Sequence, residues 1–259
     1  MNNMYKNLVR IEHDRLYPPQ QRGRPRILTF DDSFDCILKV VQTGMQWRQL
    51  QPTKVSHITV FKQMRMWIHA GVFRTAYTRL LRLYCRQRRS RYYCIDSTYV
   101  KNIYGRDCVG RNPTDRGRRA TKLSAVVDDL GVPHSLIVTA ANISDQKLLQ
   151  PTIQDMLSSC HRGKELFADK GYDSAMNRRI CKSYGFNDRI FKRRTTNGKR
   201  THAKRGVVER YFSWHDKYRR LLVRYEQNVQ VYLGMTFMTA GIRLNQIFSK
   251  FHIASKAES

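Results

Sequence analysis

Acidic residues are scarce in this chain. Its 259 residues include 20 Asp and Glu against 48 Lys and Arg, so the formal net charge is +28. The positive charge is also clustered, because residues 74–91 hold seven arginines and residues 189–205 hold eight Lys or Arg, with no acid in either run. This excess favours nucleic acid as a partner over a merely solvated basic surface. Anionic membrane is the weaker alternative, because neither run has an apolar face long enough to anchor it.

Long apolar runs and paired cysteines are also absent. No stretch approaches the roughly 18–20 apolar residues of a membrane span. Residues 1–6 lack the apolar core of a secretory signal. The six cysteines form no C-x-x-C pair and show no spacing typical of zinc ligands. We therefore expect a cytoplasmic protein with free thiols and no membrane partner.

The N-terminal part is expected to contain an arm followed by helices. Residues 1–30 are polar and rich in Pro and Arg, which predicts a basic arm or linker without a folded element. The segment 22–25, Arg-Gly-Arg-Pro, is similar to an AT-hook, although a basic linker is the favoured interpretation. Apolar periodicity predicts three short helices within residues 31–90, separated at Gly44 and Gly71.

A tight turn between the first two of these helices makes them a plausible helix-turn-helix unit. Lys62 and Arg65 would then face outward and contact DNA. A purely structural three-helix cap fits the pattern nearly as well.

From residue 91 the pattern changes to strands alternating with helices. Strands are predicted at 91–101, 123–128, 134–140, 165–169 and 188–192, and helices begin at Ser144, at Ser174 and near Ala203. This order describes an α/β fold with a mixed five-stranded sheet flanked by helices, which is the order of the ribonuclease H-like fold. We expect this domain to span residues 91–250 and a tail to occupy 251–259.

Three acids stand out against the basic background. Asp96 and Asp169 each close an apolar run, and Glu209 lies at the border of the buried stripe of the last predicted helix. Functional groups of α/β sheets gather at strand ends, so these carboxylates can meet at one point. Hard oxygen ligands select Mg²⁺, with Mn²⁺ as the alternative, and two such ions support phosphoryl transfer. Taken singly, each acid also has a structural explanation, as a turn cap or a solvent-facing helical residue.

Short motifs recur in order along nearly the whole chain. They are Trp47-Arg48, Val60-Phe61 through Phe73, Ile95-Asp96-Ser97-Thr98, Gly110 through Gly117, Ala141-Asn142 with Asp145, Ala168 through Asp173, Arg205 through Trp214, Arg219-Arg220-Leu221 and Arg224-Tyr225-Glu226. Taken together, these motifs resemble those of bacterial insertion-sequence transposases of the DDE class, in the four/five group. The resemblance implies a DNA transposase that binds the ends of a mobile element, cleaves there and joins the freed 3′-hydroxyl to a target. It also implies Mg²⁺ held by Asp96, Asp169 and Glu209 as the catalytic carboxylates.

The family signature around the glutamate reads Tyr-x2-Arg-x3-Glu-x6-Lys. Arg205 and Glu209 fit it, whereas His202 stands at the tyrosine position and Asp216 at the lysine position, with Lys217 one place late. Arg205 lies one helical turn before Glu209, where it can orient that carboxylate or hold a phosphate. Lys217 is the corresponding candidate for a DNA contact.

Two further segments are candidate DNA contacts. The loop 110–117 carries Arg111 and Arg116 and follows the Asp96 strand, which favours phosphate contact over a merely flexible loop. The basic run leading into the Glu209 helix is expected to hold phosphates through Lys192, Arg193 and Arg194.

We therefore expect a Mg²⁺-dependent polynucleotidyl transferase whose partners are the double-stranded DNA of transposon ends and target. A homodimer or larger assembly in the synaptic complex, located at the bacterial nucleoid, follows from that activity. A decayed or domesticated copy that binds DNA without cutting is the main alternative. A nuclease without strand transfer is the third.

Overall fold

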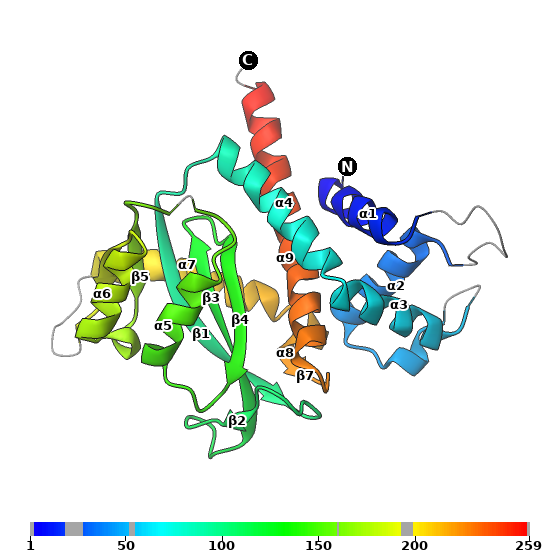
Figure 1. Ribbon diagram of the computed structural model, residues 1–259, viewed down its shortest axis with the longest axis horizontal. Helices are drawn as coiled ribbons and strands as arrows, with labels where there is room; N and C mark the ends of the chain where they lie inside the picture. Colours follow the sequence, from blue (N-terminus) through cyan, green and yellow to red (C-terminus); the bar gives the residue numbers. More distant parts are fainter. Residues whose placement is uncertain (1–2, 19–27, 52–54, 160, 193–198, 258–259) are drawn as a thin grey trace.

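The computed structural model describes residues 3–18, 28–51, 55–159, 161–192 and 199–257. Figure 1 shows a sheet with its flanking helices on one side of the molecule and a group of helices on the other. The long helices α4 (Val72–Gln87) and α9 (Val229–Ala257) run between these two parts. The predicted AT-hook-like segment and the end of the predicted tail lie outside the described residues.

The predicted N-terminal helices are present as α2 (Phe30–Thr43), α3 (His57–His69) and α4. Thr29 and Ser56 cap the first two, each accepting a backbone N–H in the first turn. Gly44 ends α2 with a φ of 72°, a left-handed conformation that glycine adopts without steric cost. The tight turn predicted between α2 and α3 is wrong, because residues 44–56 separate them and include the short helix η1 (Trp47–Gln49).

Two helical segments differ from the sequence-based expectation. Residues 4–16 form helix α1 (Met4–Leu16), so the predicted unfolded arm is wrong over this range. The helix is held by tertiary packing: the ring of Tyr5 lies against Gly241 of α9, and its backbone N–H donates to Asn245 Oδ1 at 3.2 Å. Helix α9 continues to Ala257, through most of the predicted tail.

The sheet has the predicted order with two short additions. Its main strands are β1 (Tyr92–Asn102), β3 (Arg119–Asp128), β4 (Pro133–Ala140), β5 (Glu165–Ala168) and β6 (Asn187–Ile190). β1, β3 and β4 are antiparallel neighbours, whereas β1, β5 and β6 pair in parallel. Among the described residues, the two-residue strands β2 (Gly110–Arg111) and β7 (Val223–Arg224) bring the sheet to seven strands, against five predicted.

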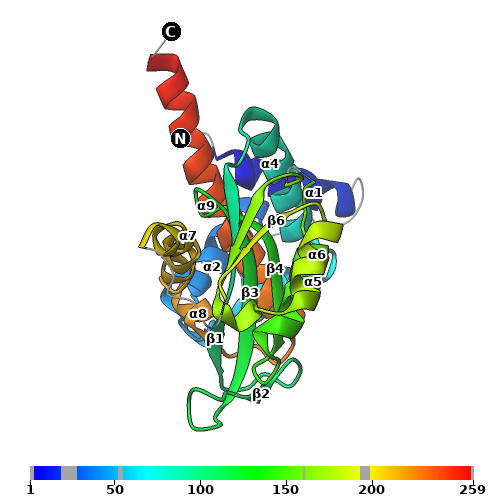
Figure 2. The ribbon, with the colours of Figure 1, turned by 90° about the vertical axis from the view of Figure 1, so that its left-hand side faces the viewer.

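Helices cover both faces of the sheet. Figure 2 shows α7 (Lys199–His215) on one face and α5 (Asp145–Gln154) with α6 (Ala175–Ser183) on the other. A small core lies under α5 and α6, while one large core joins the inner face of α7 to α1–α4 and α9. The N-terminal helices and the sheet therefore share one hydrophobic core.

Two simpler expectations can be compared with the described residues. Cys36, Cys85, Cys94, Cys108 and Cys181 are free thiols, as predicted, and Cys160 lies outside the described residues. Within the described ranges, no helix has both the length and the apolar character needed to cross a bilayer.

Candidate active site

The parallel pairing of β1 with β5 brings two of the predicted acids together. Cys94 is opposite Phe167 at the end of this pairing, and Asp96 and Asp169 each follow two residues later. Asp96 does not end its strand as expected, because β1 continues to Asn102 through its antiparallel pairing with β3. The carboxylates therefore lie where β5 leaves the sheet and exposes the edge of β1.

Helix α7 supplies the third acid and an arginine that contacts all three. Val207 and Val208 are buried against the sheet, which aims the neighbouring face of α7 at the strand ends. Arg205 donates from Nη1 to Asp169 Oδ1 at 3.2 Å and from Nη2 to Asp96 Oδ2 at 3.3 Å. Its Nη2 also lies 3.9 Å from Glu209 Oε1, one helical turn away. The three predicted catalytic acids thus surround a single guanidinium.

The three carboxylates differ in exposure. The Asp96 side chain is 21% exposed, against 45% for Asp169 and 64% for Glu209. Burial raises the pKa of Asp96, and the neighbouring Asp169 carboxylate adds to the rise. The backbone N–H of Ser97 and the Arg205 guanidinium oppose it by stabilising the charged form. The charge of the buried Asp96 carboxylate is therefore stabilised by Arg205 and by the Ser97 backbone.

The donor set suits a hard divalent cation, although its present arrangement is built around Arg205. The guanidinium is a stand-in cation among carboxylate oxygens, which are the ligands that Mg²⁺ and Mn²⁺ prefer. No three His, Cys, Asp or Glu side chains in the described part of the chain are grouped closely enough to hold a metal ion. The residues fit such an ion chemically, on condition that the arginine moves away from them.

A buried lysine next to this site was missed by the sequence reasoning. Lys122, only 2% exposed, donates to Ile143 O at 2.8 Å and to Asp145 Oδ1 at 3.1 Å. The same oxygen of Asp145 accepts from Ser97 Oγ at 2.7 Å. Asp145 thereby ties β3 and α5 to the residue after Asp96. Its place in a recognised motif was a signal, but its lysine partner lay far away in the sequence.

The predicted DNA-contacting residues lie on several exposed surfaces and do not gather at one place. The described side chains that face solvent are Lys62, Arg65, Arg111, Arg116, Lys192 and Lys217. Arg193 and Arg194 lie outside the described residues. Arg205 differs from the other candidates, because it is 9% exposed and is occupied by the three acids.

Arg111 and Arg116 belong to a hairpin formed by β2, the following turn and β3. Asn112 organises the turn by accepting from the backbone N–H of Thr114 at 3.0 Å and from its hydroxyl at 2.8 Å. Gly117, with a φ of 71°, and Arg116, with a φ of 49°, complete the reversal. The two arginines are held on an ordered turn.

Folding uses part of each basic run for internal ion pairs. Arg79 pairs with the buried Glu12 at 2.6 Å, and Arg88 with Asp129 at 2.5 Å. Arg189 and Lys204 both bind Glu165, at 2.8 and 3.3 Å. The runs contain no acid themselves, yet acids from elsewhere in the chain neutralise several of their members.

Comparisons with known proteins identify the family of the chain. Residues 87–242 match the model of the family described as "Transposase DDE domain", and residues 11–77 match "Putative transposase of IS4/5 family". The "Putative transposase for insertion sequence element IS402" of Burkholderia cepacia is 36% identical over 136 residues, which cover 50% of this chain and 64% of the relative. The chain thus matches less than two thirds of that relative's length.

The fold itself is similar to a solved transposase. The structure titled "Cryo-EM structure of piggyBac transposase synaptic complex with hairpin DNA" superposes with a TM-score of 0.56 at 11% identity, covering 100% of this chain and 74% of that one. This likeness concerns the ribonuclease H-like fold, while the family match covers most of the sheet domain and its acids. The chain belongs to the family of transposases with a DDE domain.

Proposed function

We propose that this protein is a DNA transposase that cleaves phosphodiesters at the ends of an insertion sequence and joins the freed 3′-hydroxyl to target DNA. The observation that carries the proposal is the convergence of Asp96, Asp169 and Glu209 on one point at the strand ends. Three acids meeting in a chain of net charge +28 favour a cation site beside a surface for polyanions.

Asp96, Asp169 and Glu209 are the residues that would hold Mg²⁺, or Mn²⁺ in its place. Bound ions of this kind activate the attacking oxygen and stabilise the leaving oxygen of an in-line displacement. Asp96 lies on β1, where the strand pairs with β3 on one side only, because the pairing with β5 ends at Cys94. Glu209 lies on α7, which packs on the sheet through Val207 and Val208. Asp169 follows β5 directly and begins the short helix η2 (Lys170–Tyr172).

In this proposal Arg205 binds either the catalytic carboxylates or a DNA phosphate. With the carboxylates unoccupied by metal, its guanidinium neutralises part of their charge. If a divalent cation neutralised the acids instead, the Arg205 guanidinium would be free to bind a phosphate at the active site. Phe191 stacks against the guanidinium, with 5.7 Å between the guanidinium carbon and the ring centroid, and limits the directions in which it swings.

DNA would contact exposed basic side chains on more than one surface of the protein. We assign phosphate contacts to Arg111 and Arg116 on the hairpin, to Lys192 after β6 and to Lys217 after α7, because these side chains are exposed and basic. We assign contacts with the element's end to Lys62 and Arg65 on α3. Phosphate contacts fix the register of a duplex without reading its sequence. We assign Arg193 and Arg194 to the same phosphate surface on the basis of the sequence.

Transposition requires two ends to be held together, so we propose a homodimer or larger assembly in the synaptic complex. The piggyBac structure, titled a synaptic complex with hairpin DNA, supports this by analogy of fold. We place the reaction in the bacterial cytoplasm, at nucleoid DNA.

A DNA-binding protein that no longer cuts is the second candidate. It is favoured by Asp216, which stands at the signature lysine position and lies 3.3 Å from His215 Nδ1. An acid at this place repels phosphate where the signature has a cation. The opposing observation is that all three catalytic acids are present and close together.

A cleavage assay tests the proposal. The full chain is incubated with Mg²⁺ and a labelled duplex carrying the inverted repeats that flank its gene. We expect cleavage at the repeat end, and we expect Asp96→Ala, Asp169→Ala and Glu209→Ala each to abolish cleavage while end binding persists. Asp14→Ala, which removes an exposed acid from α1, is the matched control.

The outcomes separate the candidates. End binding without cleavage by the wild-type protein identifies the non-cutting alternative. Cleavage without joining to a target identifies a nuclease. Normal cleavage by any one of the three variants removes that residue from the site.

A further inference from the structure

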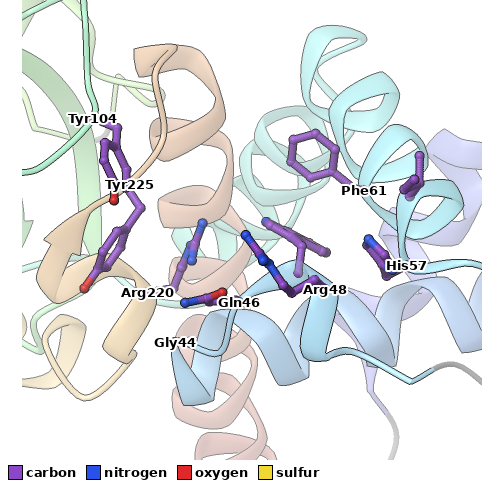
Figure 3. A pocket seen from close by; sticks show the side chains of 10 residues that line it. Gly44, Gln46, Arg48, His57, Phe61, Tyr104, Arg220 and Tyr225 are labelled. Carbon is purple, nitrogen blue, oxygen red and sulfur yellow. The ribbon is translucent and has the colours of Figure 1, made fainter.

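A cavity of about 600 Å³ lies between the N-terminal helices and the sheet domain, away from the three acids (Figure 3). One wall comes from the end of α2, from η1 and from α3. The other comes from the loop after β1 and from the segment α8 (Arg219–Leu222) to β7. From Asp96 to the end of β1 at Asn102 the strand advances about 20 Å, so the cavity is remote from the proposed cleavage site.

Aromatic rings face each other across this cavity. Trp47 and Phe61 pack edge to face on the helical wall, with ring centroids 5.2 Å apart. Tyr104 and Tyr225 pair on the opposite wall at 6.3 Å, and their residues are 63% and 38% exposed. Trp47 and Phe61 are half-buried, whereas the two tyrosine rings are exposed and provide the stacking surface for a flat ligand.

The charge of the cavity selects an anion. None of its ten described lining residues is acidic, and two of them are Arg48 and Arg220. Arg220 is bound to Glu226 at 2.7 Å and its guanidinium lies 5.0 Å from the centroid of the Tyr225 ring. Arg48 is exposed and forms no ion pair with any residue that the structure describes. Figure 3 shows both arginines between the two aromatic walls.

The framework behind this wall is rigid. Arg224 is fully buried and donates to Asp107 O at 2.7 Å and to Thr121 Oγ1 at 3.0 Å, which fastens the loop after β1 to β7 and β3. On the helical side, the turn at Gly44 lies so close to α8 that a Cβ there would stand 3.0 Å from Arg219 Cβ. The two walls are therefore held at a fixed separation.

We propose that this cavity binds one unpaired nucleotide of DNA, with its base stacked on the exposed aromatic rings and its phosphate at Arg48. Every base has a π-face, so such a site accepts unpaired DNA with little sequence preference. A second copy of this chain is a poorer occupant, because it also carries a net charge of +28. The inference rests on the proposed function in supposing that the polyanion is DNA.

The test compares single-stranded with double-stranded DNA. Fluorescence anisotropy measures binding of the full chain to a labelled strand of about twelve thymidines and to a blunt duplex of the same length. Tyr104→Ala removes the most exposed ring and Tyr104→Phe keeps it. Arg48→Ala removes the proposed phosphate contact, and Arg89→Ala removes an exposed charge beyond the far end of α4 as the matched control.

We expect Tyr104→Ala to weaken binding of the single strand about tenfold while the duplex affinity changes less than about twofold. Tyr104→Phe should bind both probes like the wild type. Arg48→Ala should weaken binding of the single strand. It should also make the slope of log affinity against log salt concentration shallower by about 0.7. Arg89→Ala should leave the difference between the two probes unchanged.

Other outcomes overturn the inference or the proposed function separately. Equal losses for both probes in Tyr104→Ala, or no loss in either Tyr104→Ala or Arg48→Ala, exclude an unpaired-nucleotide site. A dimer in sedimentation velocity that Tyr104→Ala dissociates shows that a second copy fills the cavity. A wild-type protein that binds neither probe contradicts the proposed function itself.

Discussion

The position of Arg205 leads to a prediction about metal affinity. A divalent cation must take Asp96 and Asp169 away from the guanidinium that now binds them at 3.3 and 3.2 Å. Metal binds only to molecules whose carboxylates are not held by Arg205. The apparent metal affinity is therefore the intrinsic affinity multiplied by the fraction of molecules in which the carboxylates are free. Arg205→Gln keeps a polar side chain of similar length but removes the competing charge. We therefore expect the variant to bind Mn²⁺ more tightly in the absence of DNA.

The size of this effect follows from the exposure of the acids. Asp96 is mostly buried, so its charge-assisted hydrogen bond is stronger than that of an exposed pair. The contacts to Asp169 and Glu209 face solvent, at 45% and 64% exposure, and are screened to at most about 1 kcal/mol together. We take about 1–2 kcal/mol as the free energy by which the contacts of Arg205 with the three carboxylates oppose metal binding. Removing these contacts corresponds to about a 5- to 30-fold gain in Mn²⁺ affinity.

Electron paramagnetic resonance of free Mn²⁺ measures this binding directly. Arg74→Gln is the matched control, because it breaks an arginine ion pair with Asp155 elsewhere in the molecule and should leave Mn²⁺ affinity unchanged. Circular dichroism checks that the variants are folded. If folded Arg205→Gln binds Mn²⁺ no more tightly than the wild type, the guanidinium does not compete for the carboxylates.

The remaining predictions concern DNA, packing and pH. The double variant Arg111→Ala with Arg116→Ala should bind duplex DNA with a weaker salt dependence. The slope of log affinity against log salt concentration should become shallower by up to about two, as measured in a salt titration. Gly241→Ala should destabilise by about 1–3 kcal/mol in urea unfolding because its methyl group meets the Tyr5 ring, whereas Gly206→Ala has room and should not. Burial raises the pKa of Asp96 in the folded state above its value in the unfolded chain. The unfolded chain therefore ionises first, and the free energy of unfolding falls as pH rises above about 4. The stability of Asp96→Asn relative to the wild type should therefore increase between about pH 4 and 7 in metal-free buffer.

Local signals were sufficient to predict the sheet domain. The strands and helices from β1 to α7 follow the predicted order, because their apolar periodicity and their caps are set by neighbouring residues. The proximity of Asp96 and Asp169 was also predicted, since both follow the parallel pairing of β1 with β5, although Asp96 lies within its strand and not at its end. Glu209 joins them from α7.

The errors concern segments whose structure depends on distant residues. Helix α1 has a polar sequence and forms because Tyr5 and Val9 are buried against α4 and α9. No local pattern reveals that Gly241 leaves room for the Tyr5 ring. The same reason explains why Arg205 could be identified from its motif, while its contacts with two strands were visible only in the folded chain.

The distribution of charge after folding gives the strongest reason to expect a cation at the three acids. Elsewhere in this chain an acid such as Glu165 is shared by two cations, Arg189 and Lys204, as expected where bases outnumber acids. At the candidate site the ratio is reversed, since three carboxylates contact one guanidinium. When ionised, these four groups carry −3 + 1 = −2 inside a protein of net charge +28. A local negative charge that a basic chain leaves partly uncompensated is the electrostatic requirement for binding a divalent cation.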